Sequence, residues 1–208
     1  MRVLILTWEY PPKRLGNVSE HVNTLAHELV RRKHEVEVVV LDDWRQGFED
    51  VYGVHVHRVA NPVKTHPMAS MLTYAVTASL PFEAESSNIV YYHKQQQRSI
   101  DVIHAHEWLT VYPAIILKHA FNIPFVLTFH SLEGHRCHDR FSAPSIAIKE
   151  IEDAGMWESN EVITNTDWMR NEVLRYYGSG HAGKTNVVWP IGEDWVDHVV
   201  SVYQKVAK

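Results

Sequence analysis

The sequence predicts a single α/β domain built on a doubly wound parallel sheet. Short apolar runs alternate with segments of helical periodicity along most of the chain. The first two apolar runs, residues 3–7 and 35–41, are separated by the length of one β-α-β crossover. No linker rich in Pro, Gly or Ser divides the 208 residues, 45% of which are hydrophobic, so one sizeable core is expected.

The first half of the chain contains three expected strands. Residues 3–7 form a continuous apolar run, typical of a strand that helices cover on both faces. A loop over residues 9–17 leads into a helix, because apolar residues recur at helical spacing at Val22, Leu25, Ala26, Leu29 and Val30. A second strand follows at residues 35–41. Residues 54–59 alternate as in a strand near an edge, and residues 61–98 are expected to be irregular or helical.

The second half of the chain repeats the same alternation. Four more strands are expected at residues 102–106, 124–130, 161–164 and 186–189. Helices are expected between them at residues 109–120, 146–157 and 167–177. Repeated β-α units with right-handed crossovers build a doubly wound, Rossmann-like parallel sheet.

Composition excludes several classes of protein. The net charge is −5 and the pI is near 6.3, with no basic run longer than residues 31–33, so no nucleic-acid partner is expected. The single cysteine, Cys137, permits no internal disulfide. Residues 65–82 are poor in charge, but they carry prolines and many hydroxyl groups, so a buried helix or cleft wall is favoured over membrane contact. A cytoplasmic protein is expected.

Polar and aromatic residues gather where the predicted strands end. These segments are residues 8–9, 104–108, 130–136 and 165–166. Ligands of doubly wound sheets bind outside the carboxyl ends of the strands, so these segments predict a binding site at that edge. Gly16, just before a helix, would let backbone N–H groups approach an anion, although for this glycine by itself an ordinary loop position is the favoured interpretation.

The histidines have several possible roles. His130 ends a strand, where it could donate a hydrogen bond to a sugar hydroxyl or stabilise developing charge. His104 and His106 lie on one side of a strand, where packing in a cleft wall is favoured over metal binding because no third ligand has a recognisable spacing. Residues 135–139 crowd several types of metal ligand without a zinc spacing. Neither a metal nor a cofactor is expected.

Several motifs together identify a family resemblance. Residues 1–40 contain a strand, Glu-Tyr-Pro-Pro and a glycine-containing loop; residues 101–108 match D-V-[IV]-H-x-H-[DE]-W. Residues 124–130 match P-x-V-x-T-x-H. Residues 152–178 resemble the segment that forms the last helices of a domain with these motifs. Over residues 1–192, the chain resembles the N-terminal domain of GT-B retaining glycosyltransferases of the glycogen-synthase type, glycosyltransferase families 4 and 5.

The resemblance implies a site and its ligands. His130 would be the catalytic residue, close to the transferred sugar. The residues expected to bind substrate are Arg14, Gly16, Asn17, Glu9, His104, His106, Trp108, Glu133 and Arg136. The implied partners are a nucleotide sugar, UDP- or ADP-glucose, and a saccharide acceptor.

The chain departs from the family in its loop and in its length. Gly16-Asn17 stands where the family has Gly-Gly, and Pro-Ile-Gly-Glu-Asp at residues 190–194 replaces P-N-G-[IV]-D. The family's donor domain, with its Glu-x7-Glu motif, is not found after residue 194. Residues 195–206 instead carry an apolar helical stripe resembling the family's returning final helix. We therefore expect an acceptor-side domain over residues 1–192, a helix over residues 193–208, and an internal deletion between them.

The functional expectation is half of a retaining glycosyltransferase. The complete family enzyme would transfer a hexosyl group, glucosyl by preference, whereas this form is expected to be inactive because most donor contacts are missing. The alternatives are a carbohydrate-binding or regulatory module, a nucleotide-binding domain completed by a partner chain, and a GT-B epimerase.

Overall fold

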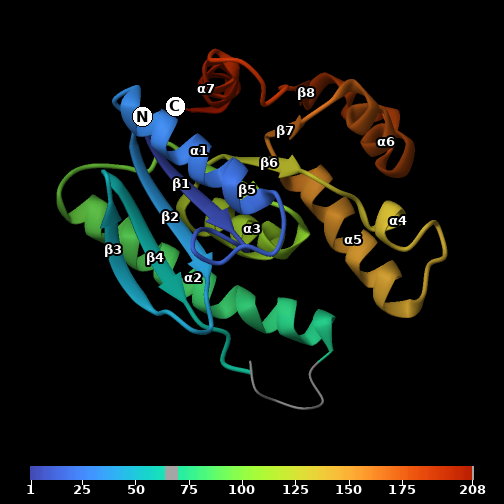
Figure 1. The fold of residues 1–208 in the computed structure, drawn as a ribbon, viewed down its shortest axis with the longest axis horizontal. Coiled ribbons are helices and arrows are strands. Elements are labelled where there is room, and N and C mark those ends of the chain that lie inside the picture. The colour runs from blue at the N-terminus through green and yellow to red at the C-terminus, as the bar shows by residue number, and fades with distance from the viewer. Residues whose placement is uncertain (64–69, 208) are drawn as a thin grey trace.

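The computed structural model describes residues 1–63 and 70–207. The described chain contains one eight-stranded sheet with the strand order β3-β4-β2-β1-β5-β6-β7-β8. The strands are β1 (Arg2–Thr7), β2 (Glu35–Leu41), β3 (Gly47–Val51), β4 (Val54–Val59), β5 (Val102–His106), β6 (Phe125–Phe129), β7 (Glu161–Thr164) and β8 (Thr185–Val187). All neighbouring pairs are parallel except β3 and β4. The predicted doubly wound Rossmann-like fold is confirmed (Figure 1).

Helices cover both faces of the sheet. They are α1 (Val18–Arg31), α2 (Met71–Gln95), α3 (Val111–Phe121), α4 (Glu133–Arg136), α5 (Ala143–Glu158), α6 (Asp167–Tyr177) and α7 (Trp195–Val206), with short 3-10 helices η1 (Trp108–Thr110) and η2 (Ser179–Lys184). One core cluster lies under α1 and α7, and the other lies under α2, α3, α5 and α6. The apolar strands are buried between these two layers, as their composition predicts.

The structure adds one strand that was not predicted, and it decides one region that the sequence left open between irregular and helical structure. The edge strand β3 runs antiparallel to β4 and was not predicted, so the sheet is not wholly parallel. Its residues are mostly exposed, and no buried alternation marks it as a strand. The region expected to be irregular or helical contains one 25-residue helix, α2, with Pro81 inside it. Of the charge-poor residues 65–82, those up to residue 69 lie outside the described part.

The helix α7 packs on the sheet beside α1 (Figure 1). Its buried residues are Trp195, Val196, Val199, Val202 and Tyr203. Asp197, on its first turn, forms an ion pair with Arg32 at the end of α1, at 2.5 Å. The predicted apolar stripe therefore faces the core. None of the described helices is long and apolar enough to cross a membrane.

Candidate functional site at the carboxyl edge of the sheet

The strand order places the topological switch point between β1 and β5. β1 leads through α1 to β2 on one side, whereas β5 leads through α3 to β6 on the other side. The connections that follow the carboxyl ends of these two strands therefore diverge and leave room for a ligand. Three histidines meet there: His106 ends β5, His130 follows β6, and His21 lies on the first turn of α1.

The three histidine rings pack against one another. His106 Nδ1 and His130 Nε2 lie 3.1 Å apart, within hydrogen-bonding distance. The His21 ring stands edge-on to that of His130, with 4.7 Å between ring centroids, and Trp195 of α7 lies 5.1 Å away on its other side. Asn165, after β7, brings its amide nitrogen within 3.1 Å of His130 Nδ1. Both nitrogens of His130 are thus held in place from neighbouring elements.

His104 supports the cluster from inside the core. Its Nδ1 lies 2.7 Å from the Tyr203 hydroxyl, and its Nε2 lies 2.7 Å from Thr128 Oγ1. Both ring nitrogens are therefore occupied, and the side chain is 1% exposed. Its ring also packs on His106 at 4.1 Å between centroids. His104 links α7 to the site without facing a ligand.

The histidine cluster is held in its neutral form. Burial lowers the pKa of His21 to about 4 and that of His104 to about 3. Burial also places the pKa values of His106 and His130 well below the usual value, and repulsion by neighbouring imidazoles adds to the effect. Near neutral pH the site therefore offers uncharged imidazoles that donate or accept hydrogen bonds, rather than a fixed positive charge.

Two polar atoms in this cluster remain without a protein partner. Among the described residues, His106 Nε2 and Asn165 Oδ1 are buried and make no hydrogen bond. A buried polar atom without a partner costs free energy. Both atoms adjoin His130, so this part of the site has hydrogen-bonding capacity that the described protein does not use.

Glu107 fixes the backbone next to His130. Its carboxylate Oε1 accepts hydrogen bonds from the backbone N–H groups of His130 at 2.6 Å and Ser131 at 2.9 Å. Glu107 itself has φ 66° and ψ 166°, a combination that is strained for any residue except glycine. Burial raises its pKa to about 7 against the opposing attraction of Arg136. A residue with a strained backbone and a buried carboxyl group thus positions the segment that follows β6.

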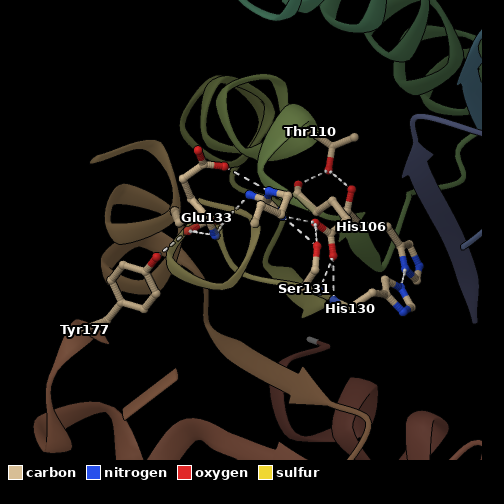
Figure 2. A network of polar contacts seen from close by, with 9 residues as sticks. His106, Thr110, His130, Ser131, Glu133 and Tyr177 are labelled. Carbon is tan, nitrogen blue, oxygen red and sulfur yellow. Dashed lines mark hydrogen bonds and ion pairs between the residues drawn. The ribbon is translucent and has the colours of Figure 1, made fainter. Parts of the chain in front are cut away.

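A polar network extends from Glu107 toward α6 (Figure 2). Arg136 contacts Glu107 at 3.4 Å, Glu133 at 2.9 Å and Glu152 at 2.6 Å. Glu152 is fully buried and also accepts hydrogen bonds from the backbone of Glu133 and from the Tyr177 hydroxyl. The predicted substrate residues Glu133 and Arg136 therefore have internal partners and hold the segment after His130 in place.

Two substitutions of Glu107 distinguish the hydrogen bonds that its side chain accepts from its negative charge. We expect Glu107→Ala to lower the free energy of unfolding by about 2–4 kcal/mol, since two buried backbone N–H groups lose their acceptor. Glu107→Gln keeps an oxygen acceptor and should cost much less. Urea unfolding measures the stability, and NMR of the His130 ring reports its position. Equal losses for the two variants, or an unmoved His130 signal in Glu107→Ala, would contradict the positioning role.

The loop before α1 binds a carboxylate of the protein itself. Glu9 Oε2 accepts hydrogen bonds from the backbone N–H groups of Leu15 at 2.5 Å and Gly16 at 2.8 Å. These N–H groups therefore hold an anion of the protein itself, the Glu9 carboxylate. Arg14 is exposed and forms an ion pair with Glu20 at 2.8 Å. Asn17 caps α1 through its backbone position alone, with φ −77°.

The structure brings some of the predicted site residues together and places others in the core. Glu9, His106 and His130 come from loops and strand ends at one edge, whereas Trp108 is 7% exposed and belongs to the core cluster under α2 and α3. Glu107 and Asn165 lie in the strand-end segments, residues 104–108 and 165–166, that predict a site at this edge, although neither was singled out as a site residue. His21 was not predicted, because it carries no comparable signal in the sequence.

One group of described residues has the spacing to hold a metal ion. Ring nitrogens of His21, His106 and His130, one from each, lie within 4.8 Å of one another. Neutral imidazoles suit zinc and similar ions, but a metal–nitrogen distance of about 2.1 Å would require the rings to draw closer. The sequence raised two other groups as possible metal sites, His104 with His106 and residues 135–139. Neither of them has this spacing.

Solved structures with the same architecture identify the fold. A sucrose-phosphate synthase chain from Thermosynechococcus elongatus superposes with a TM-score of 0.67 at 17% identity, covering 99% of this chain and 97% of that one. The catalytic domain of starch synthase IV from Arabidopsis thaliana, bound to ADP and acarbose, gives 0.53 at 16% identity, covering 88% of this chain and 50% of that one. The fold is that of a Rossmann-like half of a GT-B glycosyltransferase.

Sequence comparison assigns the family. The glycosyl transferase 4-like domain matches residues 16–190, and the chain belongs to this family. An uncharacterised glycosyltransferase of Methanocaldococcus jannaschii is 35% identical over 86% of this chain and 43% of its own length. A glycogen synthase of Mycobacterium tuberculosis is 29% identical over 88% of this chain and 46% of its own length. The chain thus spans less than half the length of these curated relatives.

Proposed function

We propose that this domain is the acceptor-side half of a retaining glycosyltransferase that moves a hexosyl group, glucosyl by preference, from a nucleotide sugar to a saccharide acceptor. The observation that carries the proposal is the placement of His130. It stands at the switch point, held by His106, Asn165 and the Glu107 carboxylate. Membership of a glycosyltransferase family and relatives that include glycogen synthases support the reaction type.

His130 is proposed to contact the transferred sugar. Both of its ring nitrogens have protein partners, so a sugar hydroxyl would have to replace the contact with His106 or with Asn165, while Glu107 holds the backbone of His130 in place. His106 Nε2 and Asn165 Oδ1 are buried and unpartnered in the described protein, so they would contact a ligand only if the cluster opens. These groups suit a polyhydroxylated ligand better than an anion, because the neutral histidines add no positive charge.

The loop of Arg14, Gly16 and Asn17 is proposed to face the donor diphosphate. Its backbone N–H groups point to one oxygen anion, which is now the carboxylate of Glu9. A diphosphate would have to displace this carboxylate or bind beside it. The starch synthase IV with a similar fold binds ADP and acarbose, which supports a nucleotide and a saccharide as ligand classes here.

The proposed activity of the whole enzyme needs donor contacts beyond those found in this domain. In the family that the chain resembles, sugar transfer depends on the closure of two domains around the diphosphate. This closure brings the catalytic groups together. We therefore propose that the 208-residue chain binds ligand weakly and does not turn over. A radiolabelled transfer assay with UDP- and ADP-glucose and a glucan primer tests this. Turnover on the order of 1 per second or faster would contradict it.

Ligand binding by the chain tests the site directly. We expect maltooligosaccharide and nucleotide sugar to shift NMR signals around Gly16, His106 and His130 together, with weak affinity because an open half-cleft buries little ligand surface. His130→Ala should weaken binding about fivefold, the effect of losing about 1 kcal/mol for one hydrogen bond. The exposed His198 provides the matched control. Equal affinities for His130→Ala and His198→Ala would contradict the assignment.

A non-catalytic carbohydrate-binding module is the second candidate. The observation that favours it is Glu9, whose carboxylate already occupies the N–H groups of Leu15 and Gly16. If saccharides shift the signals near His130 while nucleotide sugars and free nucleotides shift none, this candidate replaces the first.

A further inference from the structure

A second pocket lies away from the switch point, between the β3–β4 hairpin and the later turns of α2. These elements lie side by side at the edge of the molecule farthest from α6 (Figure 1). The pocket has a volume of about 350 Å³, within the usual range of small-molecule sites. Its lining residues are Glu37, Phe48, His55, His57, Glu85, Asn88, Ile89 and Tyr92. The four on α2 follow the spacing of one helical face.

The floor of this pocket is a buried hydrogen-bond network. The Glu37 carboxylate, 5% exposed, lies 2.8 Å from His93 Nε2, 3.0 Å from His57 Nε2 and 3.1 Å from His55 Nδ1. His57 Nδ1 lies 2.7 Å from Glu85 Oε1. Although burial opposes ionisation of Glu37, hydrogen bonds from the three imidazoles hold its pKa at about 2. The floor is therefore fixed in place by hydrogen bonds within the protein.

The walls of the pocket are aromatic and exposed. Phe48 on β3 is 62% exposed and Tyr92 on α2 is 59% exposed, although each adjoins the pocket. The Phe48 ring also packs on His57, with 5.1 Å between centroids. Within the described residues, the Asn88 amide and the Tyr92 hydroxyl take part in no hydrogen bond. The walls thus offer apolar faces and free polar groups together.

This combination selects one class of ligand. A pyranose ring has an apolar C–H face that packs on an aromatic ring, and hydroxyl groups around its edge that need hydrogen bonds. A cation fits less well, because the Glu37 carboxylate already has three imidazole partners. A purely hydrocarbon ligand would leave Glu85 and Asn88 facing apolar atoms at a cost.

We propose that this pocket is a second saccharide-binding site that takes a mono- or disaccharide unit of a glucan. The site lies on β2, β3, β4 and α2, whereas the proposed transfer site lies at the ends of β1, β5 and β6. The saccharide class comes from the pocket's own residues, whereas the choice of a glucan rests on the proposed function. A glucan held there would keep the protein on its polymer while another chain end enters the cleft.

Two adjacent tyrosines provide a matched test. Tyr92 lines the pocket, whereas Tyr91 on the same helix is equally exposed, at 57%, and packs on Phe121 instead. We expect titration of the isotope-labelled chain with maltose and maltotetraose to shift the NMR signals of Phe48, His55 and Tyr92. Tyr92→Ala should weaken that binding three- to tenfold, as expected for one lost aromatic contact. Tyr91→Ala should leave it unchanged.

The outcomes separate this inference from the proposed function. Shifts at the pocket without shifts near His130 support the second site and contradict the transfer site, and the reverse pattern does the opposite. No shift at the pocket, or equal affinities for Tyr92→Ala and Tyr91→Ala, overturns the inference. Should Tyr92→Ala fail to fold by circular dichroism, Phe48→Ala on the exposed edge strand tests the same pocket from its other wall.

Discussion

Removal of residues 193–208 is expected to abolish cooperative folding. Five side chains of α7 are buried against α1 and the sheet, and they cover one of the two core clusters. Burial of each large apolar side chain contributes about 1.5–3 kcal/mol. Their sum is comparable with the net stability of a domain, about 5–15 kcal/mol. The loss of the Tyr203 contact also leaves His104 without one of its partners.

Urea unfolding followed by circular dichroism measures this effect. We expect the shortened chain to lose its cooperative transition, and a point variant should show the same trend. Val199→Asp places a charge in the core and should strongly destabilise the protein, whereas His198→Asp at the exposed neighbouring position should change little. An unchanged midpoint for the shortened chain would show that α7 contributes no stability.

Acidification is expected to destabilise the protein through the histidine cluster. The folded-state pKa values of His21, about 4, and His104, about 3, lie below the unfolded value near 6.5. The unfolded state therefore binds more protons below about pH 6.5, and the free energy of unfolding falls as pH falls. Each histidine contributes about 1.4 kcal/mol per pH unit. Together the two histidines lower the free energy of unfolding by roughly 5 kcal/mol between about pH 6 and pH 4.

His57 has the opposite sign and a different pH window. Burial alone would lower its pKa, but hydrogen bonds to Glu37 and Glu85 raise it above the usual value. Its contribution to stability is fully present below the unfolded pKa and is lost as pH rises through the folded pKa. It therefore does not offset the loss on acidification that the buried histidines cause, whereas Glu107, whose pKa is raised to about 7, offsets part of that loss.

Equilibrium unfolding at a series of pH values tests the acid sensitivity. His21→Leu removes one neutral histidine and should reduce the slope of unfolding free energy against pH by about 1.4 kcal/mol per pH unit. His198→Leu, at an exposed position, should keep the original slope. A slope that is the same in both variants would mean that His21 becomes protonated in the folded protein.

The regular elements of the fold could largely be predicted from the sequence. Continuous apolar runs marked strands such as β1 and β2 because both of their faces are buried, and the apolar stripe on residues 195–206 marked α7 because one of its faces is buried. The edge strand β3 could not be predicted this way. Its residues are mostly exposed, and its pairing with β4 defines it as a strand.

From the amino-acid sequence it follows that polar residues come after the strands and that a parallel topology gathers them at one edge, so His106 and His130 are expected near each other. The orientation of each side chain follows only from the three-dimensional structure. Glu107 turns back to His130 through a strained backbone, Trp108 enters the core, and Glu9 reaches the N–H groups before α1. Such orientations depend on partners far away in the chain, so local pattern and spacing carry no record of them.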